Sequence, residues 1–266
     1  MPPQAPAFGR AELSTGARLA DAAPVVALVA GGALAASGLG GIAVTFAGAV
    51  LAVAGAVVGL GNLSFGSPRR ALRALHAHPA DPAGAARLVN LTEGLCFGFG
   101  LPVPDLAIVD DPVPNTLALG RAPRSATLVV TTGALNAFDR MRLEAVLAHE
   151  LAHIKRGDTA AAASVMRAFG LLSALSPAGA RLAEGALAAD REALADRAAI
   201  GVTRFPPALA DALETLAGAE TRPTSLGPSA VRLTAWQWCA PFARSPGHCR
   251  PGELDLLLRI AALREL

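Results

Sequence analysis

The sequence predicts a mainly α-helical protein with a small β-sheet, an α+β fold, preceded by a transmembrane helical hairpin. Residues 22–68 contain no charged side chain, and one membrane-spanning helix needs about 20 apolar residues. Beyond this stretch, segments with helical periodicity alternate with short segments rich in β-branched residues. We therefore divide the 266-residue chain into an N-terminal cytoplasmic segment at 1–21, the hairpin at 22–68 and a second domain at 69–266.

The composition supports a membrane-embedded part and argues against nucleic-acid binding. Hydrophobic residues make up 53% of the chain and charged residues 17%, whereas soluble domains carry about 25% charged residues. The net charge is only +2, and no run of lysine and arginine forms the basic patch of a nucleic-acid-binding protein. Cys96, Cys239 and Cys249 lack CxxC spacing, so we expect reduced thiols; Cys239 and Cys249 could pair in an oxidising compartment.

The uncharged stretch suits two membrane-spanning helices, near Pro24–Ser37 and Ile42–Leu60, joined by a glycine-rich turn at 37–41. Because the first helix is short and the turn is apolar, a re-entrant hairpin and one long tilted span are the alternatives. Arginines flank both ends of the stretch and none lies in the turn. The positive-inside rule then places both termini in the cytoplasm. We expect a multi-pass protein of the cell membrane whose second domain faces the cytoplasm.

Periodicity and chain-breaking residues define the elements of the second domain. In chain order we expect a helical region at 70–95 with a break at 78–82, a turn followed by a short strand within 101–110, a loop entering another strand within 112–120, and a strand at 126–132. Helices are expected at 139–153, at 159–189 with an interruption at Pro177, and at 190–200, 206–216 and 253–265. The strand at 126–132 is the clearest because β-branched residues dominate it. The helix that follows is also well defined, because Asp139 can cap its start and Gly157 can end it.

The strongest chemical signal lies on that helix, where His149–His153 has the sequence HELAH, an HExxH pattern. Residues four apart on a helix leave the same face, so His149 and His153 can bind one Zn²⁺ ion through their imidazoles. Glu150 projects close to that face. It can take a proton from a metal-activated water and pass it to a leaving amine, which is the role of a general base.

A catalytic zinc site needs a third protein ligand, and the segment REALAD at 191–196 offers one. We expect Glu192 to be that ligand, since Glu184, the competing candidate, has no partner acid on its own helix face. Asp196 lies one turn further along and can orient a ligand imidazole through a hydrogen bond. Asp158 follows His153 by five residues; it can cap the helix end, orient a ligand histidine or lie at the surface.

Four segments together resemble the M48 metallopeptidases, which include HtpX-like and Ste24-like membrane proteases. They are the HExxH helix at 144–158, the segment 110–120, which is similar to the family's pNAFAtG, Arg191–Asp196, which is similar to rExxAD, and 203–209, which is similar to TRyPpgL. The hydrophobic hairpin also fits this family. The order and spacing of all these features are shared over residues 22 to 266.

The resemblance implies a gluzincin fold, with a small sheet beside the active-site cleft and one zinc ion per chain. In such folds an edge strand pairs with an extended protein or peptide substrate by β-augmentation. The strand here would be 115–120 or 126–131, and we expect Asn115, Thr116 and Leu117 to take part in binding the substrate. Pairing through the backbone implies weak sequence selectivity.

Two departures from the family pattern concern the region between the zinc-binding helices and the C-terminus. Residues 159–180 hold Arg167 and Pro177, so we expect a helical connection here rather than the further span of some relatives. The family's His and Arg near the C-terminus help to stabilise the reacting carbonyl. Arg259 is present, but Glu253 occupies the histidine position, and His248 would have to reach the site through a loop insertion.

These features predict a membrane-anchored zinc endopeptidase of the metalloendopeptidase type that cuts unfolded or membrane proteins. The alternative is a catalytically weak or inactive zinc-binding membrane scaffold, which the altered C-terminal histidine favours. A third possibility, a sensor-transducer peptidase that cleaves a repressor, would need a ligand-binding domain, and the sequence offers no segment for one. The sequence does not predict the oligomeric state.

Overall fold

The computed structural model describes the core of the second domain and short pieces of the N-terminal region. The described residues are 26–27, 29–32, 45–50, 52–53, 55–56, 67–175, 178–179, 182, 185–187, 190–218 and 256–266. The segment 1–21, most of the expected hairpin, and His248 and Glu253 lie outside these residues. Within the described part of the chain, none of the helices combines the length and the apolar character that crossing a membrane requires.

A four-stranded mixed sheet lies at the centre of the domain. Its strands are β1 (His78–Pro79), β2 (Asp105–Val109), β3 (Thr116–Leu119) and β4 (Thr127–Thr131), arranged in the order β1-β2-β4-β3. β2 and β4 are parallel, whereas β1 pairs with β2 and β3 with β4 in antiparallel fashion. Of the two strands considered for an edge position, only β3 lies at the edge. The alternative, 126–131, is wrong because β4 lies between β2 and β3.

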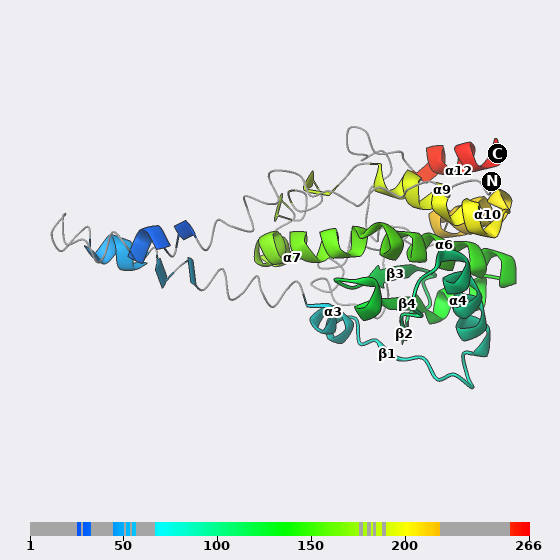
Figure 1. Cartoon of the computed structure of the whole chain (residues 1–266), viewed down its shortest axis with the longest axis horizontal. Helices are drawn as coiled ribbons and strands as arrows, with labels where there is room; N and C mark the ends of the chain where they lie inside the picture. Colours follow the sequence, from blue (N-terminus) through cyan, green and yellow to red (C-terminus); the bar gives the residue numbers. More distant parts are fainter. Residues whose placement is uncertain are drawn as a thin grey trace.

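Eight α-helices surround this sheet in the described residues. They are α3 (Pro68–Ala74), α4 (Ala86–Phe99), α5 (Thr132–Ala137), α6 (Arg140–Arg156), α7 (Asp158–Leu175), α9 (Arg191–Thr203), α10 (Pro206–Gly218) and α12 (Leu256–Arg264), with a short 3-10 helix at Pro123–Ser125. In Figure 1, α6 lies between the sheet and the pair α9 and α10. The expected helices are confirmed within a few residues at their ends, except that the helix expected at 159–189 is confirmed only as far as Leu175, and most of 176–189 lies outside the described residues. Within the expected break at 78–82, His78 and Pro79 form strand β1.

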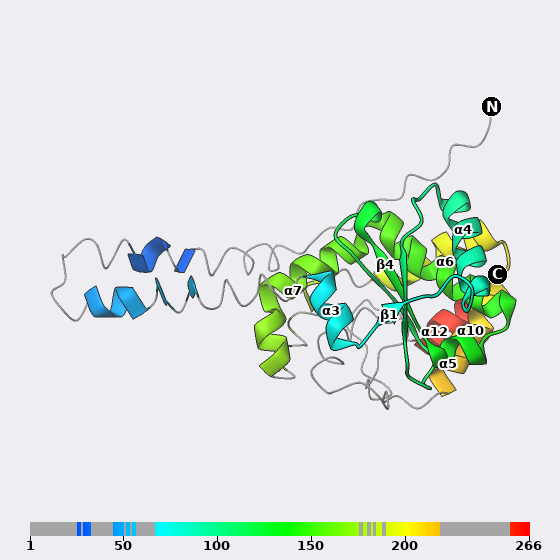
Figure 2. The same cartoon turned by 90° about the horizontal axis from the view of Figure 1, so that it is seen from below.

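The alternation of side chains along the strands gives the sheet two buried faces. Leu117, Leu119 and Val129 pack with Leu75 and with residues of α3 on one face. Ala118, Leu128 and Val130 pack on the other face in a larger cluster with residues of α4, α6, α9, α10 and α12. Figure 2 shows α3 on one side of the strands and α4 and α6 on the other. β3 therefore turns its even-numbered residues toward α6.

Local sequence signals fix both ends of α6. The Asp139 side chain accepts a hydrogen bond from the Arg142 backbone N–H at 2.9 Å and caps the start of the helix. Gly157 ends the helix with a φ of 84°, a left-handed conformation that glycine adopts without strain. Both boundary predictions are confirmed. α7 begins at the next residue, Asp158, so the chain changes direction immediately beyond the HExxH segment.

Cys96 is buried in α4 and is not disulfide-bonded, whereas Cys239 and Cys249 lie outside the described residues. Burial, assisted by the negative charge of Glu93, raises the pKa of the Cys96 thiol to about 11. The Cys96 side chain therefore packs in the hydrophobic core, and its thiol is not reactive.

Candidate active site

The HExxH residues lie on the buried part of α6, facing the sheet and α9. His149 has no exposed surface, and Glu150 and His153 are also buried. The spacing of four residues brings the two imidazoles together, with their ring centroids 4.7 Å apart and their Nε2 atoms separated by 3.1 Å. The interior of the domain therefore holds two histidine nitrogens that converge on one point.

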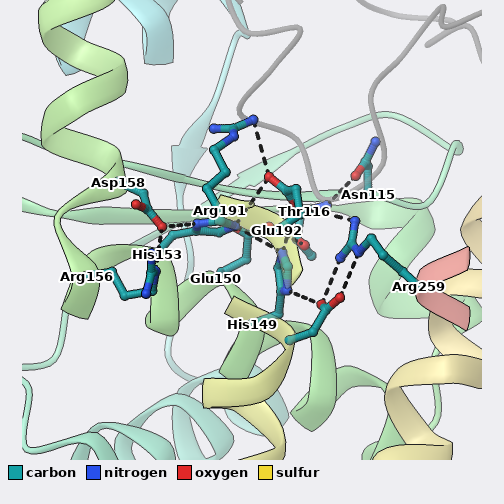
Figure 3. Close-up of polar contacts among 11 residues, drawn as sticks. Asn115, Thr116, His149, Glu150, His153, Arg156, Asp158, Arg191, Glu192 and Arg259 are labelled. Carbon is teal, nitrogen blue, oxygen red and sulfur yellow. Dashed lines mark hydrogen bonds and ion pairs between the residues drawn. The ribbon is translucent and has the colours of Figure 1, made fainter. Parts of the chain in front are cut away.

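Helix α9 supplies the third group at this point. One Glu192 carboxylate oxygen lies 3.3 Å from His149 Nε2, and the other lies 3.6 Å from His153 Nε2. The candidate ligand atoms of all three residues lie within 4.8 Å of one another. Figure 3 shows the two histidines and Glu192 directed at one another from two helices. The three residues form a group that can hold one metal ion.

Each histidine is also bound by a carboxylate through its other ring nitrogen. His149 Nδ1 lies 2.8 Å from Asp196 Oδ1, and His153 Nδ1 lies 2.8 Å from Asp158 Oδ2. A proton on each Nδ1 donates to its carboxylate and leaves a lone pair on each Nε2. When both rings are neutral, these two lone pairs, 3.1 Å apart, repel each other, and a proton or a metal ion between them relieves the repulsion. Two imidazoles and one carboxylate are also the donor set of many catalytic zinc sites, so these residues fit zinc.

Three buried arginines hold the acids in place. Arg259, on α12, donates from Nε to Asp196 Oδ2 at 2.7 Å and from Nη2 to Oδ1 at 2.8 Å, and its Nη1 lies 3.4 Å from Glu192. Arg156 Nε donates to Asp158 Oδ2 at 3.2 Å. Arg191 Nη2 lies 3.3 Å from Glu192 Oε1. Each acid that orients or could bind a metal therefore has a positive partner.

The charges around the site shift the pKa values of its members. Burial raises the pKa of Asp196, but Arg259 and His149 outweigh it and hold this pKa well below its usual range. Burial likewise raises the pKa of Glu192, and Arg191 and the two histidines outweigh it, so this carboxylate is ionised. Burial lowers the pKa of His153, yet Glu192 and Asp158 raise it to about 10. The field at the two imidazoles therefore favours positive charge.

Glu150 has different surroundings from Glu192. Thr116, on β3, donates from Oγ1 to Glu150 Oε1 at 3.0 Å, whereas the buried Oε2 atom has no hydrogen-bond partner in the described part of the chain. Burial raises the pKa of Glu150; Glu192 raises it further, and the two histidines and the Thr116 hydroxyl oppose the shift. A buried carboxylate with a raised pKa and one uncommitted oxygen is suited to accepting a proton.

A pocket opens beside these groups between β3, α6, α7 and α9. Its lining residues are Ala118, Glu150, His153, Asp158, Thr159, Ala162 and Arg191. The pocket brings the edge strand, the Glu150 carboxylate and one of the candidate metal ligands to a common surface. A substrate bound there would contact the groups that can react with it.

Comparison with known proteins identifies the family. The profile of peptidase family M48 matches residues 82–224, which includes the HExxH helix, Glu192 and Asp196. The chain belongs to peptidase family M48. This M48 chain is 38% identical over 161 residues to a protease HtpX homolog of Dictyoglomus thermophilum, covering 48% of this chain and 53% of the relative.

Two further relatives carry the same name. A protease HtpX homolog of Tropheryma whipplei is 36% identical over 167 residues, covering 50% of this chain and 56% of the relative. One from Acidiphilium cryptum is 35% identical over 196 residues, covering 63% and 68%. The M48 chain thus spans about half the length of the first two of these relatives. No solved structure matches it.

The structure brings together most, but not all, of the predicted site residues of the M48 chain. The side chains of His149, Glu150, His153, Glu192, Asp196, Asp158 and Arg259 meet in one cluster. The Arg259 guanidinium is hydrogen-bonded to Asp196 and does not line the pocket. His248 and Glu184 are outside the described residues. Of the three predicted substrate residues, Leu117 points to the α3 face of the sheet, away from the site.

Asn115 and Thr116 lie near the site but make internal bonds. The Asn115 side chain accepts a hydrogen bond from the Thr116 backbone N–H at 3.0 Å, and the Thr116 hydroxyl is bound to Glu150. Sequence reasoning missed this link to the candidate base, and it missed Arg156 and Arg191. Both arginines are adjacent in sequence to segments with predicted ligands, and that adjacency was the signal that could have found them.

Proposed function

We propose that this chain is a membrane-anchored zinc-dependent endopeptidase that hydrolyses peptide bonds of unfolded or membrane proteins. The observation that carries the proposal is the buried group formed by His149, His153 and Glu192, whose candidate ligand atoms lie within 4.8 Å of one another. Glu150, with an uncommitted buried oxygen, adjoins this group. A zinc peptidase needs at least a set of metal ligands and an adjacent carboxylate that acts as the base.

In this proposal each residue of the cluster has a separate task. Zinc, when bound, would polarise the scissile carbonyl and make water a better nucleophile. Glu150 accepts a proton from the attacking water at Oε2 and delivers it to the leaving amine. Burial raises the pKa of Glu150, which supports the first step because a carboxylate with a raised pKa accepts a proton more readily. Asp196 and Asp158 fix the ring orientation of the two histidines.

The edge strand β3 supports a peptide as the substrate. Asn115 O accepts from the Thr131 backbone N–H at 3.0 Å, so the odd-numbered residues of β3 direct their backbone groups at β4. The backbone groups of Thr116 and Ala118 then point away from β4. Asn115 occupies the Thr116 N–H, whereas Ala118 lines the pocket. We infer that an extended substrate pairs with the backbone of Ala118, which implies little selectivity for its side chains.

The described pieces of the N-terminal region support a membrane anchor. The described helical residues at 26–27 and 29–32 and those at 45–50, 52–53 and 55–56 approach each other so closely that a Cβ on Gly31 would lie 2.7 Å from Gly48 O. Their valine and phenylalanine side chains point outward with exposed fractions of 51–71%, at Val26, Val29, Phe46, Val50 and Val53. Two segments that pack through glycine and expose apolar side chains fit a hairpin in the lipid bilayer. With the flanking arginines, this supports a cell-membrane protein whose catalytic domain faces the cytoplasm.

One observation favours the alternative of a zinc-binding scaffold with weak or no activity. The resemblance assigns Arg259 to the reacting carbonyl, but its guanidinium makes two hydrogen bonds to Asp196 and is buried. A transition state that lacks a positive hydrogen-bond donor for its oxyanion is stabilised less. The scaffold alternative therefore predicts bound zinc without turnover.

The test is proteolysis of an unfolded protein such as casein by the purified full-length chain and by its Glu150→Gln variant. We expect Glu150→Gln to lower turnover by at least about 100-fold, because general acid–base catalysis contributes roughly 10²–10⁴-fold. Zinc content should stay at one per chain in both proteins. Glu144→Gln, on the same helix but only half-buried, is the matched control and should retain full activity.

Two results would count against the proposal. Equal turnover by wild type and Glu150→Gln would show that Glu150 is not the base. Stoichiometric zinc in a wild-type protein that cuts no unfolded substrate would favour the scaffold instead.

A further inference from the structure

We propose that Thr116 is a positioning residue for the candidate base, holding Glu150 so that Oε2 faces the reacting groups. The inference rests on the proposed function, because it concerns the same reaction. It starts from an asymmetry in one carboxylate: Oε1 accepts a hydrogen bond from the Thr116 hydroxyl at 3.0 Å, and the buried Oε2 has no hydrogen-bond partner among the residues that the structure describes.

The Thr116 hydroxyl is held by a rigid element. Thr116 has no exposed surface and is paired with Val130 across the β3–β4 ladder. Its backbone N–H donates to the Asn115 side chain at 3.0 Å, and the Asn115 N–H donates in turn to Thr131 Oγ1 at 2.8 Å. A β-branched side chain on such a fixed backbone has little freedom at χ1. The hydroxyl therefore donates from a fixed point.

Glu150 needs such a fixed donor more than its neighbours do. Both candidate metal-binding histidines on α6 are held by carboxylates at 2.8 Å. Glu192, whose Oε2 also has no hydrogen-bond partner among the described residues, forms ion pairs with Arg191 and Arg259. For Glu150, the Thr116 hydroxyl is the hydrogen-bond donor at 3.0 Å to Oε1. Fixing one oxygen of a carboxylate also fixes the direction of the other oxygen. The base is then held in its reactive orientation before the substrate binds.

The burial of the Thr116 hydroxyl adds to the case, because the residue has no exposed surface. A buried hydroxyl needs a partner, because leaving it unbonded costs free energy. Here the partner is the Glu150 carboxylate, which also lines the pocket, so the hydroxyl contacts a group placed to take part in the reaction.

A purely structural role makes different predictions from a positioning role. If Thr116 only fills space and satisfies its hydroxyl, replacing it with valine changes stability and leaves the kinetic constants alone. If it positions Glu150, Thr116→Val lowers kcat while KM and zinc content stay the same, because Thr116 contacts Glu150 and not the candidate ligands. Thr116→Ser keeps the hydroxyl and should keep most of kcat.

The experiment compares wild type, Thr116→Val, Thr116→Ser and Glu150→Gln as full-length proteins in casein proteolysis, with zinc content and thermal unfolding measured for each. We expect kcat of Thr116→Val to fall roughly 10-fold, the effect of losing one hydrogen bond to a charged group. Thr92→Val is the matched control. Thr92 is equally buried, and its hydroxyl donates to Leu88 O at 2.8 Å, within α4. It should leave kcat unchanged.

The outcomes separate this inference from the proposed function. If wild type is active and Glu150→Gln is not, but Thr116→Val has wild-type kcat, only the role of Thr116 is wrong. Equal losses in Thr116→Val and Thr116→Ser, or a loss that follows zinc content, would overturn it as well. If wild type and Glu150→Gln do not differ, both proposals fail. A crystal structure of Thr116→Val gives a readout independent of turnover: the Glu150 carboxylate should leave its position beside residue 116.

Discussion

The two candidate metal-binding histidines are held in the same way by parts of the chain that lie at very different distances along the sequence. His149 is bound by Asp196 at 2.8 Å, and Asp196 is bound by Arg259 from α12, 63 residues further along. His153 is bound by Asp158 at 2.8 Å, and Asp158 by Arg156, two residues before it. Each half is a histidine, an acid and an arginine; one half is long-range and the other is local.

This difference shows which half depends on the whole fold. The local half needs only the turn between α6 and α7, which Gly157 makes possible. The long-range half exists only when α9 packs against α6 and when α12, packed against α10, brings Arg259 to Asp196 (Figure 3). α12 also lies beyond residues 82–224, the part that matches the family profile. We therefore expect the His149 half to respond more strongly to substitution than the His153 half.

The largest effect should come from Glu192, the residue on which the two halves converge. Glu192→Ala removes the carboxylate that faces both Nε2 atoms and leaves two protein ligands, fewer than a catalytic zinc site uses. We expect the variant to lose zinc on dialysis, whereas wild type keeps about one ion per chain, as measured by elemental analysis. Glu93→Ala, at an exposed position of α4, is the control. Full zinc retention by Glu192→Ala would remove Glu192 from the ligand set.

The next effect should separate the two arginines. Arg259→Met leaves the buried Asp196 without its bidentate partner, and breaking a buried ion pair costs about 3–5 kcal/mol of unfolding free energy. Loss of an orienting group also lowers metal affinity by about 10- to 100-fold. Arg156→Met removes a single hydrogen bond of 3.2 Å and should cost less in both respects. Denaturant unfolding and zinc competition with a chromophoric chelator measure the two effects, and equal losses would contradict the proposed asymmetry.

The local half of the site was also the part that could be predicted from the sequence. The boundaries of α6 at Asp139 and Gly157 follow from caps that act within one turn, and the i, i+4 spacing of His149 and His153 follows from helix geometry. The approach of Glu192 and Asp196 to those histidines could be predicted only because a second acidic pair at helical spacing stood beside a strong motif.

The remainder depends on tertiary packing, which spacing does not encode. Strand order placed β4 inside the sheet and β3 at its edge, although both strands have similar sequences of small and β-branched residues. The contact between Thr116 and Glu150 joins residues that are 34 positions apart in the sequence, and no local sequence pattern predicts it. Arg259 was expected at the reacting carbonyl by resemblance, but it binds Asp196, because α12 docks with the guanidinium directed at that acid.

The smallest effect, and the sharpest test of the comparison, should come from Asp158→Asn. The asparagine amide oxygen can still accept the hydrogen bond from His153 Nδ1, so the ring keeps its orientation, but the bond loses the charge that makes such bonds roughly twice as strong. We expect zinc affinity to fall by about 10-fold, the low end for a group that orients a ligand.

Asp196→Asn is the matched substitution in the other half, where Arg259 would lose the nearer of its two buried counter-charges. Its zinc affinity should fall closer to about 100-fold, and its unfolding free energy should fall as well. The same chelator competition and the same unfolding measurement serve both variants. If Asp158→Asn proved as damaging as Asp196→Asn, the two halves would be energetically equivalent. The dependence of zinc binding on α12 would then have to arise from something other than the Arg259–Asp196 pair.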